Sequence, residues 1–176
     1  MPEQTLARPL IVARRLAPDA WPRHDGDDAP AGGPALVRLD VWQAAAARDD
    51  LAPWLPSDTD LTPAMAESLM AAPLIGIDFP AFTDGRGYSL ARLLRERYGY
   101  GGQIRALGDV LIDQLFFMSR CGIDAFSLRD DQVVEDALHA LTTFSRSYQP
   151  GTDDPEPLFR RRLRERAASR QAPALA

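Results

Sequence analysis

The chain has 176 residues, of which 45% are apolar and 26% charged, a composition typical of one folded domain. No apolar run reaches the roughly 18 residues of a membrane span, and the N-terminus lacks the features of a secretory signal, so we expect a cytoplasmic protein without a membrane partner. One cysteine, Cys121, excludes an internal disulfide and an all-cysteine metal site, and with only two histidines we predict no metal site.

All twenty basic residues are arginine, which excludes a Schiff-base lysine and a P-loop lysine. The net charge of −5 is unevenly distributed, because residues 151–176 carry +2 and the remainder carries −7. A body this acidic is not expected to bind nucleic acid.

We divide the chain into three regions. Residues 1–35 contain one apolar strand, Leu10–Val12, and a polar Pro/Gly-rich stretch, Asp19–Pro34, that we interpret as a long loop or a partly disordered insertion. Residues 36–150 form an α/β domain. Residues 151–176 form an arginine-rich, flexible tail with a frayed helix.

Two strands and two short helices are predicted in the first half of the α/β domain. Ala35–Val41 alternates like a strand, and a short helix covers Val41–Arg48. A second helix covers Leu61–Met70 after a capping signal at Thr59–Asp60, and Pro73–Phe79 is a buried strand.

The second half of the domain alternates helices and strands. We expect Ser89 to cap a helix with Leu90, Leu93 and Leu94 on one face, and Asp109 to cap the next helix. The predicted strands are Gln103–Leu107 and Asp124–Leu128. Asp130 and Asp131 then place negative charge at the start of a helix that bears Val134, Leu138 and Leu141.

This order predicts a single α/β domain with a mainly parallel sheet built from consecutive βα units. The sheet is either doubly wound or a barrel-like arc, since the chain is too short for a barrel of eight units. An exposed sheet edge would favour a homodimer.

Ligands of parallel α/β sheets collect beyond the carboxyl ends of the strands. The polar residues of the three turns at those ends are Asp84, Arg86, Tyr88, Ser89, Asp109, Asp113, Gln114 and Arg129. Asp84 and Asp109 are candidate acid/base groups. The candidates to bind an anion or a partner are Arg86, Tyr88, Ser89, Asp113, Gln114 and Arg129, with the two arginines as the anion holders. The alternatives are a structural turn in which Arg86 pairs with a nearby aspartate, and a capping role for Asp109.

No nucleophile–base set can be assembled from these residues, and the Gly85-Arg86-Gly87 turn is not a dinucleotide fingerprint. The residues therefore predict no cofactor and leave open whether the protein is an enzyme.

Residues 79–129 resemble the bacterial family catalogued as domain of unknown function 934, and the resemblance extends from about Leu36 to Gln149. The matching motif residues are Phe79, Pro80, Phe82, Asp84, Gly85, Arg86, Gly87, Tyr88, Ser89, Arg92, Gly108, Asp109, Asp113, Gln114, Arg120, Cys121, Gly122, Asp124, Phe126 and Arg129. Members of this family are labelled oxidoreductases of sulfite reduction, but the family has no agreed mechanism from which catalytic roles could be carried over.

The resemblance leaves two main hypotheses. In the first, the protein is an accessory of assimilatory sulfate and sulfite reduction in bacterial cysteine biosynthesis, binding sulfite reductase or its electron donor through the charged turns. In the second, it is a small enzyme acting on a sulfur oxyanion or related metabolite, with arginine anion holders and an aspartate acid/base. A regulator of the pathway is a third reading.

Overall fold

The computed structural model describes residues 8–45, 48–144 and 147–171, with side chains up to residue 166. The strands are β1 (Leu10–Val12), β2 (Arg15–Ala17), β3 (Ala35–Arg38), β4 (Leu51–Pro56), β5 (Leu74–Phe79), β6 (Gln103–Gly108) and β7 (Ala125–Ser127). The helices are α1 (Leu39–Ala44), α2 (Pro63–Leu69), α3 (Arg86–Arg92) with its π-helical extension η1 (Leu93–Arg97), the 3₁₀ turn η2 (Ile112–Gln114), α4 (Leu115–Arg120), α5 (Val134–Ala140) and α6 (Leu158–Gln171).

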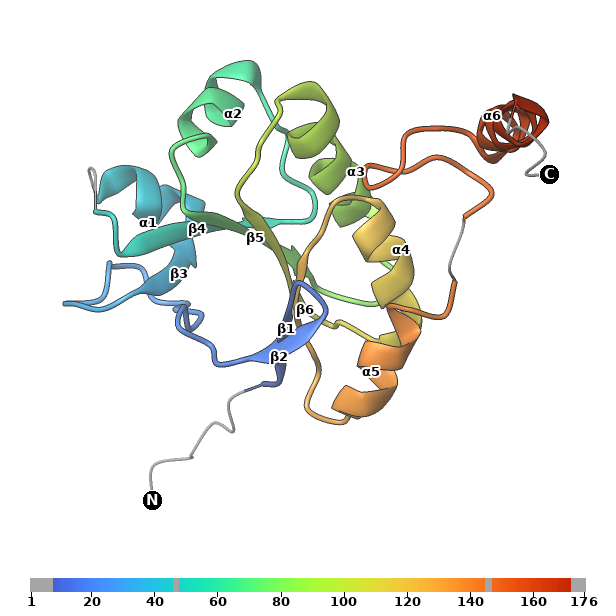
Figure 1. Ribbon diagram of the computed structural model, residues 1–176. Helices are drawn as coiled ribbons and strands as arrows, with labels where there is room; N and C mark the ends of the chain where they lie inside the picture. The colour runs from blue at the N-terminus through green and yellow to red at the C-terminus, as the bar shows by residue number, and fades with distance from the viewer. Residues whose placement is uncertain (1–7, 46–47, 145–146, 172–176) are drawn as a thin grey trace.

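The described strands form one seven-stranded sheet in the order β2-β1-β7-β6-β5-β4-β3. From β3 to β7 every strand lies parallel beside the next one in sequence, whereas β1 runs antiparallel to β7 and to β2. Because right-handed crossovers between consecutive neighbours all lie on the same face, helices α1 to α5 line the outer side of a curved sheet (Figure 1). The arc is therefore the correct alternative, and the sheet is not closed into a barrel.

The main core lies between the outer face of the arc and its helices. Alternate residues of β5 and β6, such as Ile75, Ile77 and Ile104, pack against Leu90 and Leu94. The π-helical turn changes the phase of the helix, so Leu93 is partly exposed instead of sharing their face. Ser89 does not cap this helix, which begins three residues earlier at Arg86.

The concave face of the sheet is covered by the N-terminal segment between β2 and β3. Trp21 packs on the apolar side chains of this face, and Arg23 forms an isolated parallel bridge with Leu36. Arg23 pairs with Asp78 of β5, and the buried Arg105 of β6 pairs with Asp19 at 2.7 Å. Of the two alternatives for this segment, the long loop is correct and the partly disordered insertion is wrong, because the loop packs on the sheet.

Two strands escaped the sequence patterns. β4 was missed because its sequence, LAPWLP, contains Pro53 and Pro56, and β2 was missed because it has three residues and an exposed pattern. The cap of α2 also differs from the prediction, since Thr62 accepts the backbone N–H of Met65 at 3.3 Å. The remaining predicted strands are confirmed as β1, β3, β5, β6 and β7 with small shifts in their bounds.

Candidate functional site at the carboxyl edge of the sheet

The turns after β5, β6 and β7 open on the same edge of the sheet, as predicted. Phe79 and Gly108, the last residues of β5 and β6, are register partners, and Asp109 donates its N–H to the Phe79 carbonyl at 2.8 Å. We call the surface formed by residues 80–86, 109–114 and 128–133 the carboxyl-edge face. Three elements distant in sequence therefore place their charged residues on one surface.

Asp84 is the centre of the first charged group on this face. Its carboxylate accepts hydrogen bonds from Nε and Nη2 of Arg86, at 3.0 and 2.7 Å, and from the Arg86 backbone N–H at 3.1 Å. The hydroxyl of Ser57, at the end of β4, donates to it at 2.7 Å. These donors, the Arg86 guanidinium first, hold the pKa of Asp84 well below its usual range, so the carboxylate stays ionised.

Arg129 is the centre of the second group. Its Nε and Nη2 donate to Asp131 at 2.7 and 2.6 Å, and its Nη1 donates to Asp109 at 2.8 Å. The carboxylate of Asp131, followed by that of Asp109, raises the pKa of Arg129 above its usual value. Both arginines of the candidate site are thus engaged by carboxylates of their own turns.

The turn carrying Phe82 is fixed between the two groups. The Phe82 N–H donates to the second oxygen of Asp109 at 2.9 Å, and the Phe82 carbonyl accepts from Nε2 of Gln114 at 2.6 Å. Asp109 therefore does not cap a helix: η2 starts at Ile112, and the Asp109 carboxylate ties the Phe82 turn to Arg129. The Phe82 ring itself is 52% exposed.

Gly108 makes this arrangement possible. Its φ of +88° is a conformation that favours glycine, and a Cβ there would lie 2.3 Å from the Phe79 carbonyl oxygen. Any side chain at this position would push β5 and β6 apart where Asp109 leaves the sheet.

The other predicted site residues do not join the charged groups. Tyr88 packs between Phe79 and Phe117, with ring centroids 5.3 and 5.1 Å apart, and burial raises its pKa. Ser89 and Asp113 are exposed on α3 and η2. That these residues bind an anion or a partner stays a prediction.

Sequence reasoning missed several residues near this edge. Ser57 and Asp58, which lies 3.5 Å from Arg86, were overlooked because β4 itself was missed. Asp78 and Arg105 were overlooked although each is a charged residue inside an apolar strand. That pattern indicates a polar partner on the concave face.

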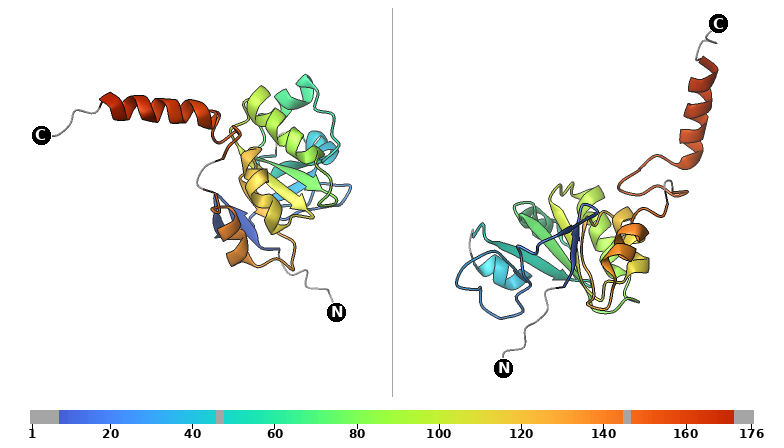
Figure 2. Two further views of the ribbon diagram at one scale, coloured as in Figure 1. Left: turned by 90° about the vertical axis from the view of Figure 1, so that its right-hand side faces the viewer. Right: turned by 60° about the horizontal axis from the view of Figure 1, so that its bottom comes forward.

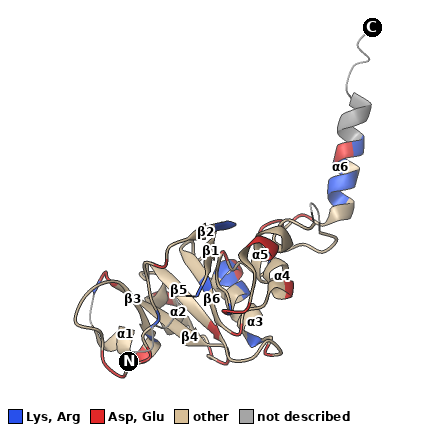
Figure 3. Cartoon of the chain, turned by 90° about the horizontal axis from the view of Figure 1, so that it is seen from below, with Lys and Arg blue, Asp and Glu red and all other residues tan. Residues whose placement is uncertain are grey.

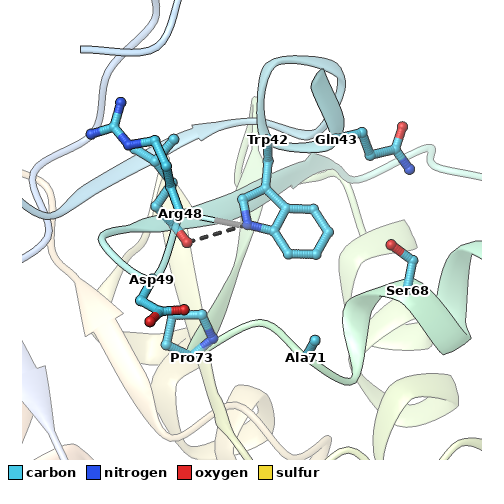
Figure 4. Close-up of a pocket in the computed structure, with 8 residues that line it drawn as sticks. Trp42, Gln43, Arg48, Asp49, Ser68, Ala71 and Pro73 are labelled. Carbon is cyan, nitrogen blue, oxygen red and sulfur yellow. Dashed lines mark hydrogen bonds between the residues drawn. The ribbon is translucent and has the colours of Figure 1, made fainter. Parts of the chain in front are cut away.

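A pocket of about 450 Å³ lies at the opposite, amino edge of the sheet, between α1 and α2 (Figure 4). Trp42 donates its indole N–H to the Leu51 carbonyl at 3.2 Å, while the guanidinium of Arg48 points away and pairs with Asp50. This pocket is separate from the carboxyl-edge face.

Among the described residues, no group of three or more His, Cys, Asp or Glu side chains is placed to hold a metal ion. The thiol of Cys121 is buried, and burial raises its pKa, which makes the thiolate less accessible. Within the same described ranges, none of the helices has the length and apolar character to cross a membrane.

Comparison with curated proteins and with solved structures gives no significant match. One family profile, described as "Bacterial protein of unknown function (DUF934)", matches residues 52–159, which include β5 to β7, all of β4 except Leu51, and the whole carboxyl-edge face. The chain therefore belongs to the DUF934 family of bacterial proteins.

Proposed function

We propose that the protein is a non-catalytic accessory of assimilatory sulfite reduction in the cytoplasm. In this proposal it binds sulfite reductase, or the electron donor of that enzyme, through the carboxyl-edge face. The link to sulfite reduction is supported by the resemblance of residues 79–129 to a family labelled in that way. The mode of action is supported by the exposed Phe82, held in a fixed turn between the ion-pair groups of Arg86 and Arg129.

The chemistry of the face favours recognition over catalysis. Asp84 is a weak base because Arg86 and Ser57 stabilise its ionised form, and it is not protonated near neutral pH to act as an acid. Both oxygens of Asp109 accept hydrogen bonds, from Arg129 and from the Phe82 N–H. A sulfur oxyanion would have to displace carboxylates from both arginines before it could bind there.

Aromatic residues and arginine are enriched in protein-binding surfaces, which have a polar rim. Phe82 has both backbone hydrogen bonds satisfied by side chains from another turn, so binding would order little additional structure. The half-exposed Arg86 and Arg129 form a polar rim, and charged groups of a partner that pair with this rim would fix its orientation.

The test measures the affinity of purified sulfite reductase, and of its electron donor, for the immobilised protein. Phe82→Ala should weaken one of these interactions by about tenfold or more. Leu16→Ala, a change at another exposed apolar residue, on β2, should leave it unchanged. Wild-type protein that binds neither component, or two variants that bind equally well, would contradict the proposal.

Growth on sulfate separates this proposal from the enzyme hypothesis. Arg86→Ala and Asp109→Asn should impair growth only to the extent that they weaken partner binding. If growth is lost while binding remains intact, the protein acts as an enzyme and the accessory function is wrong.

A further inference from the structure

A groove of about 610 Å³ is lined by residues of α3 and α4, by Phe144 and by residues 147–150, none of which belongs to the carboxyl-edge face. Its aromatic side chains include Phe117, Phe144 and Tyr148, which are 56, 61 and 83% exposed. Phe144 stacks obliquely on Phe116 with ring centroids 5.0 Å apart, so the aromatic surface is already formed. Several exposed rings around one groove mark a binding surface.

The basic residues of this groove are neutralised from within the chain. Arg92 pairs with Glu96 at 2.8 Å, and Arg120 pairs with Asp153. The groove therefore offers apolar contacts rather than free charge, and we expect it to bind apolar side chains.

Helix α6 of the same chain carries two exposed apolar side chains. Helix α6 extends away from the domain in both views of Figure 2. Phe159 and Leu163 lie one helical turn apart on it, on the same side, and each is 62% exposed. A helix of 14 residues is only marginally stable alone in water, so α6 gains stability where Phe159 and Leu163 pack on another surface.

Residues 149–157 connect the groove to α6, and their contacts direct the helix outward. Thr152 donates its N–H to the Arg120 carbonyl at 3.0 Å, and Arg120 also binds Asp153 and the Gln149 carbonyl. Gly151 fits closely here, because a Cβ would lie 2.7 Å from the Arg120 guanidinium carbon. This part of the connection is therefore held against the end of α4.

The start of α6 is fixed to the same connection. Arg161 pairs with Asp154, and Arg164 pairs with Glu156 at 2.9 Å. Pro155 and Pro157 restrict the backbone between them. Because both ends of the connection are pinned, α6 is held away from the groove of its own chain.

Charge favours contact between α6 and another copy of the domain. Residues 158–171 contain six arginines and one glutamate, a net charge of +5, so the rest of the chain carries −10. Figure 3 shows the basic residues of α6 on a helix that stands clear of the sheet. An arm of this charge is attracted to the acidic body of a second copy.

We propose that two copies of the chain form a dimer by exchanging their α6 arms. Phe159 and Leu163 of each copy enter the aromatic groove of the other, beside Phe117, Phe144 and Tyr148. The same pair of surfaces is used twice about a two-fold axis, which gives a closed dimer. The exchanged dimer does not depend on a partner bound by the carboxyl-edge face.

The first test measures mass by sedimentation velocity at micromolar concentrations. The wild-type protein should sediment as a dimer. The arm variant Phe159→Ala/Leu163→Ala and the groove variant Phe117→Ala/Phe144→Ala should each weaken dimerisation by about tenfold or more. The matched control Leu16→Ala, which alters an exposed apolar residue outside both surfaces, should remain dimeric.

Mixing the two defective variants gives a sharper result. The groove variant still has an intact arm, and the arm variant still has an intact groove, so the mixture should recover a heterodimer with one of the two contacts. If the dimer instead formed by contact of arm with arm or of groove with groove, the mixture would not recover a dimer. That result would overturn the exchange.

A disulfide trap distinguishes exchange from folding back. In a Cys121→Ala background, the pair Tyr148→Cys and Leu163→Cys should oxidise to a covalent dimer on a non-reducing gel. A covalent link within one chain would overturn the proposal, as would a monomeric wild-type protein or a dimer that the arm and groove variants do not weaken.

Discussion

The carboxyl-edge face and the concave face of the sheet both contain arginine–aspartate pairs, but the pairs differ in reach and burial. On the carboxyl-edge face, Arg86 binds Asp84 and Arg129 binds Asp131, each only two residues away, and Arg129 also reaches Asp109 across 20 residues. On the concave face, Arg23 reaches Asp78 across 55 residues and Arg105 reaches Asp19 across 86. The local pairs shape exposed turns, whereas the distant pairs attach the N-terminal segment to the sheet.

Loss of an ion pair should have different effects on the two faces. Exposed ion pairs typically contribute less than about 1 kcal/mol to stability, so those at the carboxyl edge are available for recognition. Breaking a buried pair leaves a desolvated charge and costs several times more. The carboxyl-edge pairs should therefore affect binding, and on the concave face the pair of the buried Arg105 with Asp19 should affect folding.

The largest expected effect comes from Arg105→Leu. Arg105 is 2% exposed, and its loss removes the charged partner of Asp19, which keeps the Trp21 N–H as a donor, and leaves the Trp21 carbonyl without its guanidinium donor. We expect the free energy of unfolding to fall by about 3 kcal/mol in urea titrations. Arg86→Leu is the matched control and should cost less than about 1 kcal/mol. Equal losses in the two variants would remove the distinction between the faces.

Gly108→Ala should have the next largest effect, because it strains a backbone with positive φ and places a Cβ against the Phe79 carbonyl. The expected cost is about 2 kcal/mol, measured by thermal unfolding. The same variant should also weaken partner binding, since the Asp109 contact to Phe82 depends on this turn. A stable variant with unchanged affinity would show that the turn geometry is irrelevant to recognition.

Much of the fold could be predicted because its signals are local. β5, β6 and β7 are short apolar runs next to glycines or aspartates, and their parallel order follows from the intervening helices. The arc could not be distinguished from a doubly wound sheet, since that choice depends on which face each crossover covers. The ordering of residues 18–34 depends on Arg105 and Asp78, whose contacts with Asp19 and Arg23 no local pattern reveals.

The candidate site was predicted in part for the same reason. Asp84, Arg86, Asp109 and Arg129 do meet at one edge, because parallel strands end together. Their pairing as two separate groups depends on side-chain directions, and the sequence left both a ligand and a structural pairing open for Arg86. Ser57 was missed with β4, whose two prolines hide the strand.

A smaller effect concerns pH. The pKa of Asp84 is lowered in the folded state, chiefly by Arg86, so its stabilising contribution is complete above the unfolded value of about 3.9. That contribution is lost as the pH falls toward the folded value. Stability measured by urea titration should therefore decline less steeply below about pH 4 in Asp84→Asn than in wild type.

Arg86→Ala should flatten the same pH dependence, because it removes the main cause of the shift. A slope identical to wild type in both variants would mean that the Asp84–Arg86 pair does not form in solution.

The most direct test of the central claim is hydrogen–deuterium exchange of the protein with and without purified sulfite reductase or its electron donor. We predict slower amide exchange in residues 80–86 and 109–114 on addition of the partner, with the strands of the concave face unchanged. Protection confined to other regions, or no protection with either component, would contradict the assignment of the carboxyl-edge face as the binding surface.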